Sequence, residues 1–160
     1  MKQNDYGPIP GSTIFRGISG QKAIIMAANT RIATVAKGIF KAAKETDFAV
    51  FMELARSECD LKGGYTGLTP KDFSEKMREA AKEVQFDIWA LHADHITIKT
   101  GDSQEIEGTK QLIDAQITAG YTSFAIDASH LSILKEKMSG RSWTRISRLP
   151  QSWLSILKTG

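Results

Sequence analysis

The sequence predicts an α/β fold of about four βα units around a parallel sheet. Three observations support this prediction. Short apolar runs alternate with stretches of helical periodicity from Lys22 onward, which is the pattern of βα units. The runs are continuously apolar, as in strands covered on both faces. Polar residues follow them, where parallel sheets carry their active sites. A closed barrel and a doubly wound sheet both fit this periodicity.

The first two units occupy residues 23–84. The first strand is predicted at residues 23–28 (AIIMAA), and the second at residues 48–54 (FAVFMEL). The helix after the first strand has one apolar face, formed by Ile32, Val35, Ala36, Ile39, Phe40 and Ala43. After the second strand, a glycine-rich loop leads to a helix for which Thr69 is the expected N-cap and Pro70 the first residue.

The next two strands are predicted at residues 88–91 and 123–126. The helix between them carries Ile106, Leu112, Ile113 and Ile117 on its apolar face. Gly120 follows that helix and suits the C′ position, where glycine is favoured because the backbone is left-handed. The sequence HADH, residues 92–95, closes the third strand.

Polar residues gather at the predicted carboxyl ends of the strands: Asn29, Glu53, Asp94, His95 and Asp127. All three histidines of the chain follow the third or fourth strand, at positions 92, 95 and 130. Taken singly, each of these side chains is also explained by a hydrogen bond to nearby backbone or by a helix cap. Together they favour a site. Asp94 and His95 can act on one substrate only if the strand has ended and the loop redirects one side chain.

The segments ALHADH (residues 90–95) and AGYTSFAIDASHL (residues 119–131) resemble the third and fourth strands of class II ketose-bisphosphate aldolases. The resemblance covers residues 11–131 and implies a partial (β/α)8 TIM barrel. It further implies metal-dependent aldol cleavage and condensation of a ketose bisphosphate, with zinc as cofactor. In these terms Asp94 is the catalytic acid and base, His95 and Asp127 bind metal, and Asn29 lies near the substrate.

A second resemblance supports a different function. The loop GGYTGLTPKDF (residues 63–73) is similar to the accessory subunit associated with tagatose-bisphosphate aldolase. It implies a non-catalytic barrel subunit that stabilises an aldolase partner. The stretch ITIKTGDSQEI (residues 96–106) is longer than we expect of tagatose aldolases, so the particular ketose stays open.

We divide the chain at Leu131, into the aldolase-type half barrel (residues 1–131) and a non-homologous tail (residues 132–160). The tail holds six basic residues and one acid, which leaves 15 basic and 17 acidic residues before it. The barrel part is therefore mildly acidic, and we expect no nucleic-acid partner. Restoring one base after the codon for Leu131 permits the reading LFNFEGKDV followed by an amphipathic helix. We interpret the tail as a frameshift and the chain as truncated and impaired.

Cellular location and assembly follow from simpler features. Cys59 is the single cysteine, so no internal disulfide forms, and we expect a reducing, cytoplasmic location. No apolar run approaches the roughly 20 residues that cross a bilayer, so we expect no membrane association. A half barrel leaves two unpaired sheet edges, and for this reason we expect a homo-oligomer.

Overall fold

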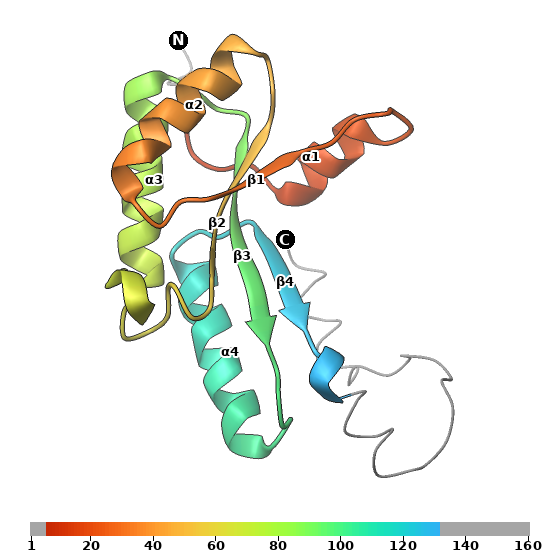
Figure 1. Cartoon of the computed structure of the whole chain (residues 1–160), viewed down its shortest axis with the longest axis vertical. Helices are drawn as coiled ribbons and strands as arrows, with labels where there is room; N and C mark the ends of the chain where they lie inside the picture. Colours follow the sequence, from red (N-terminus) through yellow and green to blue (C-terminus); the bar gives the residue numbers. More distant parts are fainter. Residues whose placement is uncertain (1–5, 132–160) are drawn as a thin grey trace.

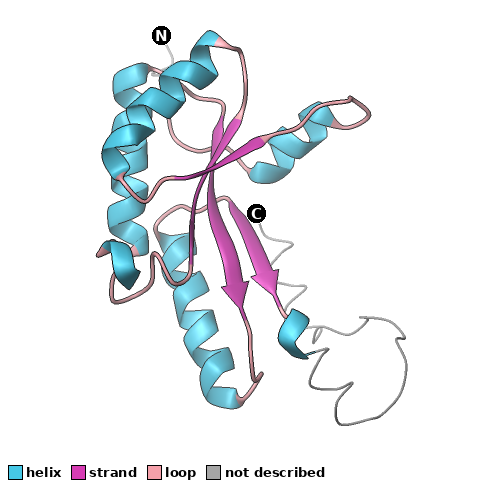
Figure 2. Cartoon of the chain, in the orientation of Figure 1, coloured by secondary structure: helices cyan, strands magenta, loops and turns pink. Residues whose placement is uncertain are grey.

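The computed structural model describes residues 6–131 and contains one four-stranded parallel sheet (Figures 1 and 2). Its strands are β1 (Met26–Asn29), β2 (Val50–Ala55), β3 (Trp89–Thr97) and β4 (Ser123–Asp127), and each pairs in parallel with the next strand of the chain. Barrels keep this sequential order, whereas doubly wound sheets reverse it at a switch point. The predicted α/β fold of a partial TIM barrel is confirmed. The predicted tail lies outside the described residues.

Within residues 6–131 one α-helix precedes β1, and three α-helices and two 3-10 turns connect the strands. The helices are α1 (Gly11–Ile18), α2 (Ala36–Glu45), α3 (Pro70–Val84) and α4 (Ser103–Thr118), and the turns are η1 (Ala33–Val35) and η2 (Gly64–Thr66). The predicted start of α3 is confirmed, since Thr69 and Asp72 form a reciprocal capping box. Gly120 follows α4 with a φ of +85°, as predicted. None of the helices in residues 6–131 is long and apolar enough to cross a bilayer.

The two faces of the sheet are covered differently. Helices α2, α3 and α4 pack on one face and α1 on the other (Figure 1). Met52 and Leu91 belong to the larger core under α2 and α3. Ile14 of α1 packs with Phe51 and Ala90 on the opposite face. Helix α1, which the hydrophobic pattern did not indicate, therefore covers the amino-terminal half of the face that corresponds to a barrel interior.

The carboxyl-terminal half of this interior face is polar. Register places Asn29 beside Glu53, Glu53 beside His92, and His92 beside Ser123. The four residues therefore form one row across all four strands. Since side chains alternate along a strand and Met52 and Leu91 face the helices, Glu53 and His92 point to the interior face.

Strand β3 continues past the point where it was predicted to end. It runs to Thr97, and its register against β4 shifts between Ala93 and Ile96. Ala93 pairs with Phe124 and Ile96 with Ile126, so β3 holds one extra residue. His95 lies inside this bulge with a φ of +49°. The prediction that the strand closes within residues 92–95 is wrong, and the bulge, instead of a loop, redirects His95.

Candidate active site

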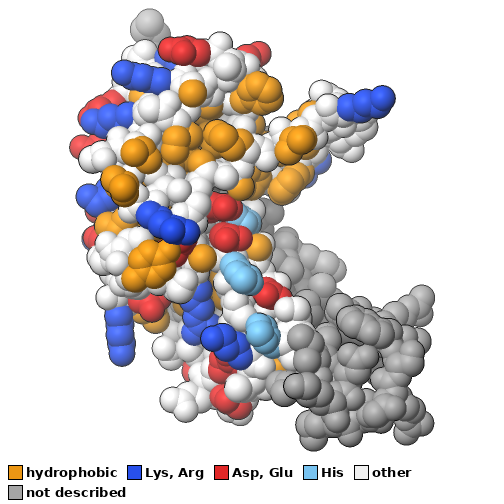
Figure 3. Space-filling model, in the orientation of Figure 1, with side chains coloured by type: hydrophobic (Ala, Val, Ile, Leu, Met, Phe, Trp, Pro, Cys, Tyr) orange, Lys and Arg blue, Asp and Glu red, His pale blue; other side chains and the backbone are white. Residues whose placement is uncertain are grey.

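The interior face carries a cluster of three potential metal ligands, Glu53, His92 and Asp94. One ligand atom from each lies within 4.8 Å of the other two, and no other group of three or more such residues occurs within residues 6–131. The Nε2 atom of His92 lies 4.0 Å from a carboxylate oxygen of Glu53. Acidic and histidine side chains gather along this face beside β3 and β4 (Figure 3). The cluster is half-buried at the end of the sheet where active sites of parallel sheets form.

The ring of His92 is held in place from two sides. Its Nδ1 atom lies 2.9 Å from the hydroxyl oxygen of Ser123, and the ring packs edge-on against Phe51 with centroids 5.7 Å apart. Burial lowers the pKa of His92, so the imidazole is neutral near pH 7. When Nδ1 donates its hydrogen to Ser123, Nε2 keeps its lone pair on the side of Glu53. That tautomer is the one that binds a metal through Nε2.

Glu53 titrates near neutral pH. Burial raises its pKa to about 7, and the negative charges of Asp94 and Glu58 add to the effect. Its side chain is only 14% exposed, so water screens these charges weakly. A cation beside Glu53 would favour the charged carboxylate, and the cluster is therefore suited to exchange a proton for a metal ion.

The donor set fits a divalent cation. One imidazole nitrogen and two carboxylate oxygens are ligands that zinc accepts at about 2.0–2.2 Å, which puts neighbouring ligand atoms roughly 3.5 Å apart around a tetrahedral ion. The separations in the cluster, up to 4.8 Å, require only a small inward movement of the side chains. If Glu53 and His92 bind the ion and Asp94 lies beside it, coordination positions remain for substrate, as they do in catalytic zinc sites.

His95 and Asp127, both predicted as metal ligands, lie together but outside this cluster. The Nε2 atom of His95 is 2.9 Å from a carboxylate oxygen of Asp127. The other Asp127 oxygen accepts a hydrogen bond from the amide of Ser129 at 2.9 Å. Hydrogen bonds from Ser129 and then His95 lower the pKa of Asp127 to about 2. Asp94, the predicted acid and base, belongs to the Glu53 cluster, so the structure divides the predicted site residues between two neighbouring groups.

Asn29, predicted to lie near the substrate, is held by protein contacts. Its amide nitrogen donates to a carboxylate oxygen of Glu58 at 2.6 Å, and its amide oxygen accepts from Nε of Arg31 at 3.0 Å. Both ends of the side-chain amide are therefore engaged. A role for Asn29 in substrate binding stays a prediction.

The sequence places Glu53 and His92 at strand ends but does not identify them as ligands. The spacing of His92 and Asp94, two residues apart on one strand, is the signal that places both on one face. Glu53 occupies the matching position of the preceding strand. Its pairing with His92 depends on the register between β2 and β3, which the sequence does not reveal.

This chain is similar to proteins described by tagatose phosphates. The D-tagatose-1,6-bisphosphate aldolase subunit GatZ of Salmonella typhimurium is 31% identical over 90 residues, which are 52% of this chain and 21% of that protein. A D-tagatose 6-phosphate 4-epimerase of Agrobacterium fabrum is 27% identical over 117 residues, or 69% of this chain and 28% of that protein. The chain thus spans between about a fifth and somewhat over a quarter of the length of these curated relatives.

A solved structure and a family model agree with these relatives. The crystal structure of a probable tagatose 6 phosphate kinase from Sinorhizobium meliloti 1021 superposes with a TM-score of 0.55 and 22% identity, covering 66% of this chain and 28% of that one. At this identity the likeness supports the fold alone. The model of the family described as D-tagatose-1,6-bisphosphate aldolase subunit GatZ/KbaZ-like matches residues 12–142. Because this match covers most of the chain, the protein belongs to the GatZ/KbaZ-like family of D-tagatose-1,6-bisphosphate aldolase subunits.

Proposed function

We propose that this chain belongs to a metal-dependent aldolase that acts on a phosphorylated ketose, and that it provides the residues that bind the cation and transfer the proton. The observation that carries the proposal is the convergence of Glu53, His92 and Asp94 on the interior face. Zinc is the cation we favour, since imidazole and carboxylate donors both suit it. A divalent cation bound there would supply the Lewis acid that polarises the substrate ketone.

Asp94 is the residue to which we assign proton transfer. In the cleavage direction its carboxylate accepts the proton of the C4 hydroxyl while the bond between C3 and C4 breaks. The electron pair of that bond moves toward the C2 carbonyl as an enediolate, and C4 becomes an aldehyde carbon. Glu53 and His92 hold the cation beside this reaction. His95 and Asp127, 2.9 Å apart, are the remaining candidate ligands.

The substrate class rests on the relatives. The descriptions of the family and of the GatZ relatives name D-tagatose 1,6-bisphosphate, and that of the epimerase relative names D-tagatose 6-phosphate. We infer that this chain also binds a ketose phosphate of this kind. The homo-oligomer, the boundary at Leu131 and the cytoplasmic location stay predictions.

An assay with a matched variant tests the catalytic proposal. The full chain would be incubated with zinc and D-tagatose 1,6-bisphosphate, and triose phosphate release measured with a coupled dehydrogenase. We expect the chain to release triose phosphate. Adding a chelator, or the substitution Asp94→Asn, should abolish this release. Asp114→Asn, an exposed change on α4, should leave release unchanged. Release that persists in Asp94→Asn would contradict the role of Asp94.

A non-catalytic accessory role is the second candidate, favoured because the family and its GatZ relatives are described as aldolase subunits. It predicts no release by the chain alone. It also predicts that the chain raises the thermal stability or turnover of a tagatose-bisphosphate aldolase. The Asp94→Asn variant should raise them as much as the unchanged chain does. Dependence on Asp94 therefore separates the two functions.

A further inference from the structure

Next to the proposed site, a buried carboxylate organises two loops at the carboxyl end of the sheet. The Glu58 side chain is 3% exposed and accepts hydrogen bonds from four donors. These are the side chains of Asn29, Arg31 and Tyr65 and the amide of Ala55, at 2.6, 2.6, 2.6 and 2.7 Å. Burial opposes ionisation, but these hydrogen bonds outweigh it and keep the pKa of Glu58 below its usual value. Glu58 is therefore a charged anchor for both loops.

Arg31 is held at one edge and open at the other. Its Nε atom donates to Glu58 at 2.6 Å and to Asn29 at 3.0 Å. Within residues 6–131 its two terminal amino groups donate to no protein acceptor, and the side chain is 60% exposed. The guanidinium lies over the ring of Tyr65, 5.8 Å from the ring centroid. Four N–H groups of a pre-oriented guanidinium thus face solvent.

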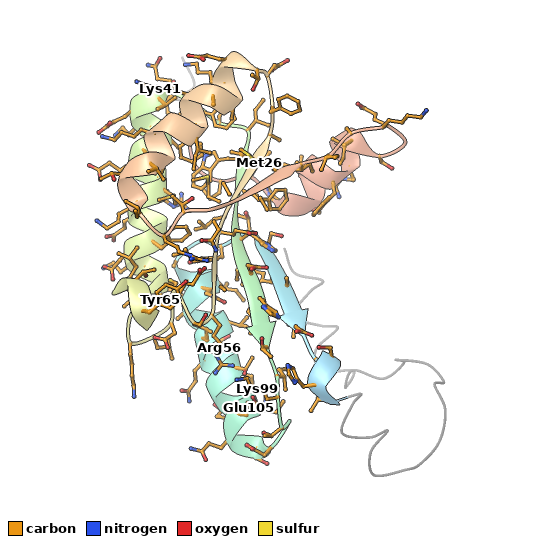
Figure 4. The ribbon with its side chains drawn as sticks, in the orientation of Figure 1. Met26, Lys41, Arg56, Tyr65, Lys99 and Glu105 are labelled. Carbon is orange, nitrogen blue, oxygen red and sulfur yellow. The ribbon has the colours of Figure 1, made fainter. Side chains whose placement is uncertain are left out.

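The loop that carries Tyr65 is fixed against Glu58. Tyr65, labelled in Figure 4, belongs to η2, whose residue Thr66 donates its hydroxyl to the Glu58 carbonyl at 2.6 Å. Gly64 has a φ of +52°, and a Cβ atom there would lie 2.4 Å from the Glu58 carbonyl carbon. Only glycine allows this approach. The ring that supports Arg31 therefore has a defined position.

Arg31 directly follows two residues whose backbone pairs with Glu53. Asn29 is the register partner of Glu53, and the amide of Thr30 donates to the Glu53 carbonyl at 3.2 Å. Arg31 is the following residue. A ligand whose reacting carbons meet Glu53, His92 and Asp94 would therefore have a cationic group within its own length.

We propose that Arg31, oriented by Glu58 and Tyr65, is an anion-binding residue that takes the phosphoryl group of the sugar phosphate. The terminal amino groups present parallel donors to two oxygens of a phosphomonoester, the geometry that guanidinium groups use for phosphate. The four donors around Glu58 share its charge, so Arg31 is not fully neutralised. The identity of the sugar rests on the proposed function, whereas the binding of phosphate does not.

Phosphate titration of the metal-free chain tests the proposal. Inorganic phosphate would be added at constant ionic strength, with chloride as the counter-titration, while the Nε–H resonances of arginine are followed by NMR. We expect a saturable shift of the Arg31 resonance, with a dissociation constant in the millimolar range. Both variants lack the Arg31 Nε–H group, so binding is compared across all proteins through the backbone amide resonances of residues 30–32. Arg31→Gln should weaken binding about tenfold or more, and Arg31→Lys less, since it keeps charge but loses the parallel donors.

The control is Arg16→Gln on α1, since the Arg16 side chain is exposed and donates only to Thr13 in the described part of the chain. Equal losses in Arg31→Gln and Arg16→Gln, or unchanged binding in Arg31→Gln, would overturn the proposal. Because Arg31 is exposed, both of its variants should fold, as circular dichroism would verify. The titration requires neither metal nor turnover, so its failure leaves the cation site untouched, and failure of the cation site leaves the titration valid.

Discussion

Glu53 and His92 are direct register partners across β2 and β3, and the Nε2 atom of His92 lies 4.0 Å from a Glu53 carboxylate oxygen. Asp94, two residues further along β3, brings a second carboxylate to the same face. The interior end of this half barrel thus combines an imidazole with two carboxylates, a combination that suits both metal binding and proton transfer.

Replacing Glu53 should change how stability depends on pH. The folded-state pKa of Glu53, about 7, lies above its usual 4.5, so the folded chain binds more protons than the unfolded chain between these values. The free energy of unfolding of the metal-free chain should therefore fall as pH rises through this window. Glu53→Gln should remove this loss. Between pH 5 and pH 8, the free energy of unfolding of the variant should rise by about 1–2 kcal/mol relative to that of the unchanged chain. Urea unfolding measures it, with exposed Glu107→Gln as control. Parallel pH profiles for the unchanged chain and Glu53→Gln would contradict the shift.

Ser123→Ala should weaken cation binding without a large loss of stability. The hydroxyl of Ser123 lies 2.9 Å from Nδ1 of His92 and holds the ring in its orientation. Loss of such a partner typically lowers metal affinity about tenfold or more. Titration calorimetry with zinc measures the change. Ser103→Ala, at an exposed position of α4, should bind zinc as the unchanged chain does. Equal affinities in both variants would count against His92 as a ligand.

Glu58→Ala should destabilise the chain strongly. The substitution leaves four donors without their acceptor, one of them from the end of β1 and one from the loop that follows it. Removing one partner of a buried charged network typically costs about 2–4 kcal/mol. Glu107→Ala, exposed on α4, should cost less than about 0.5 kcal/mol. Both values come from urea unfolding, and a small effect of Glu58→Ala would mean that the network adds little to stability.

Two glycines should respond oppositely to alanine. Gly64→Ala places a Cβ atom 2.4 Å from the backbone of Glu58 at a positive φ, so we expect a loss of about 2 kcal/mol or more. Gly108→Ala lies inside α4 with no atom within 4 Å of the added Cβ, so we expect a gain of roughly 0.5–1 kcal/mol. Thermal unfolding of the two variants compares them. A tolerated Gly64→Ala would show that η2 moves away from Glu58 easily.

The strands were predictable because continuous apolar runs mark parallel strands, although β3 was placed too short. His92 and Asp94 interrupt its apolar pattern, which reads as a strand end, but pairing with β4 extends it through the bulge at His95. Glu58 could not be identified as buried from the sequence. Acidic residues in loops are usually exposed, and its burial depends on donors at positions 29, 31 and 65 that only the folded chain brings together.

The most direct test of the cation site is the anomalous scattering of zinc in crystals of the full chain. We predict a peak within bonding distance of the Nε2 atom of His92 and of a carboxylate oxygen of Glu53, with Asp94 in contact. His92→Ala should lose the peak, and His130→Ala, an exposed change after β4, should keep it. A peak confined to His95 and Asp127, or one that survives His92→Ala, would contradict the assignment of the metal site to Glu53 and His92 with Asp94 beside it.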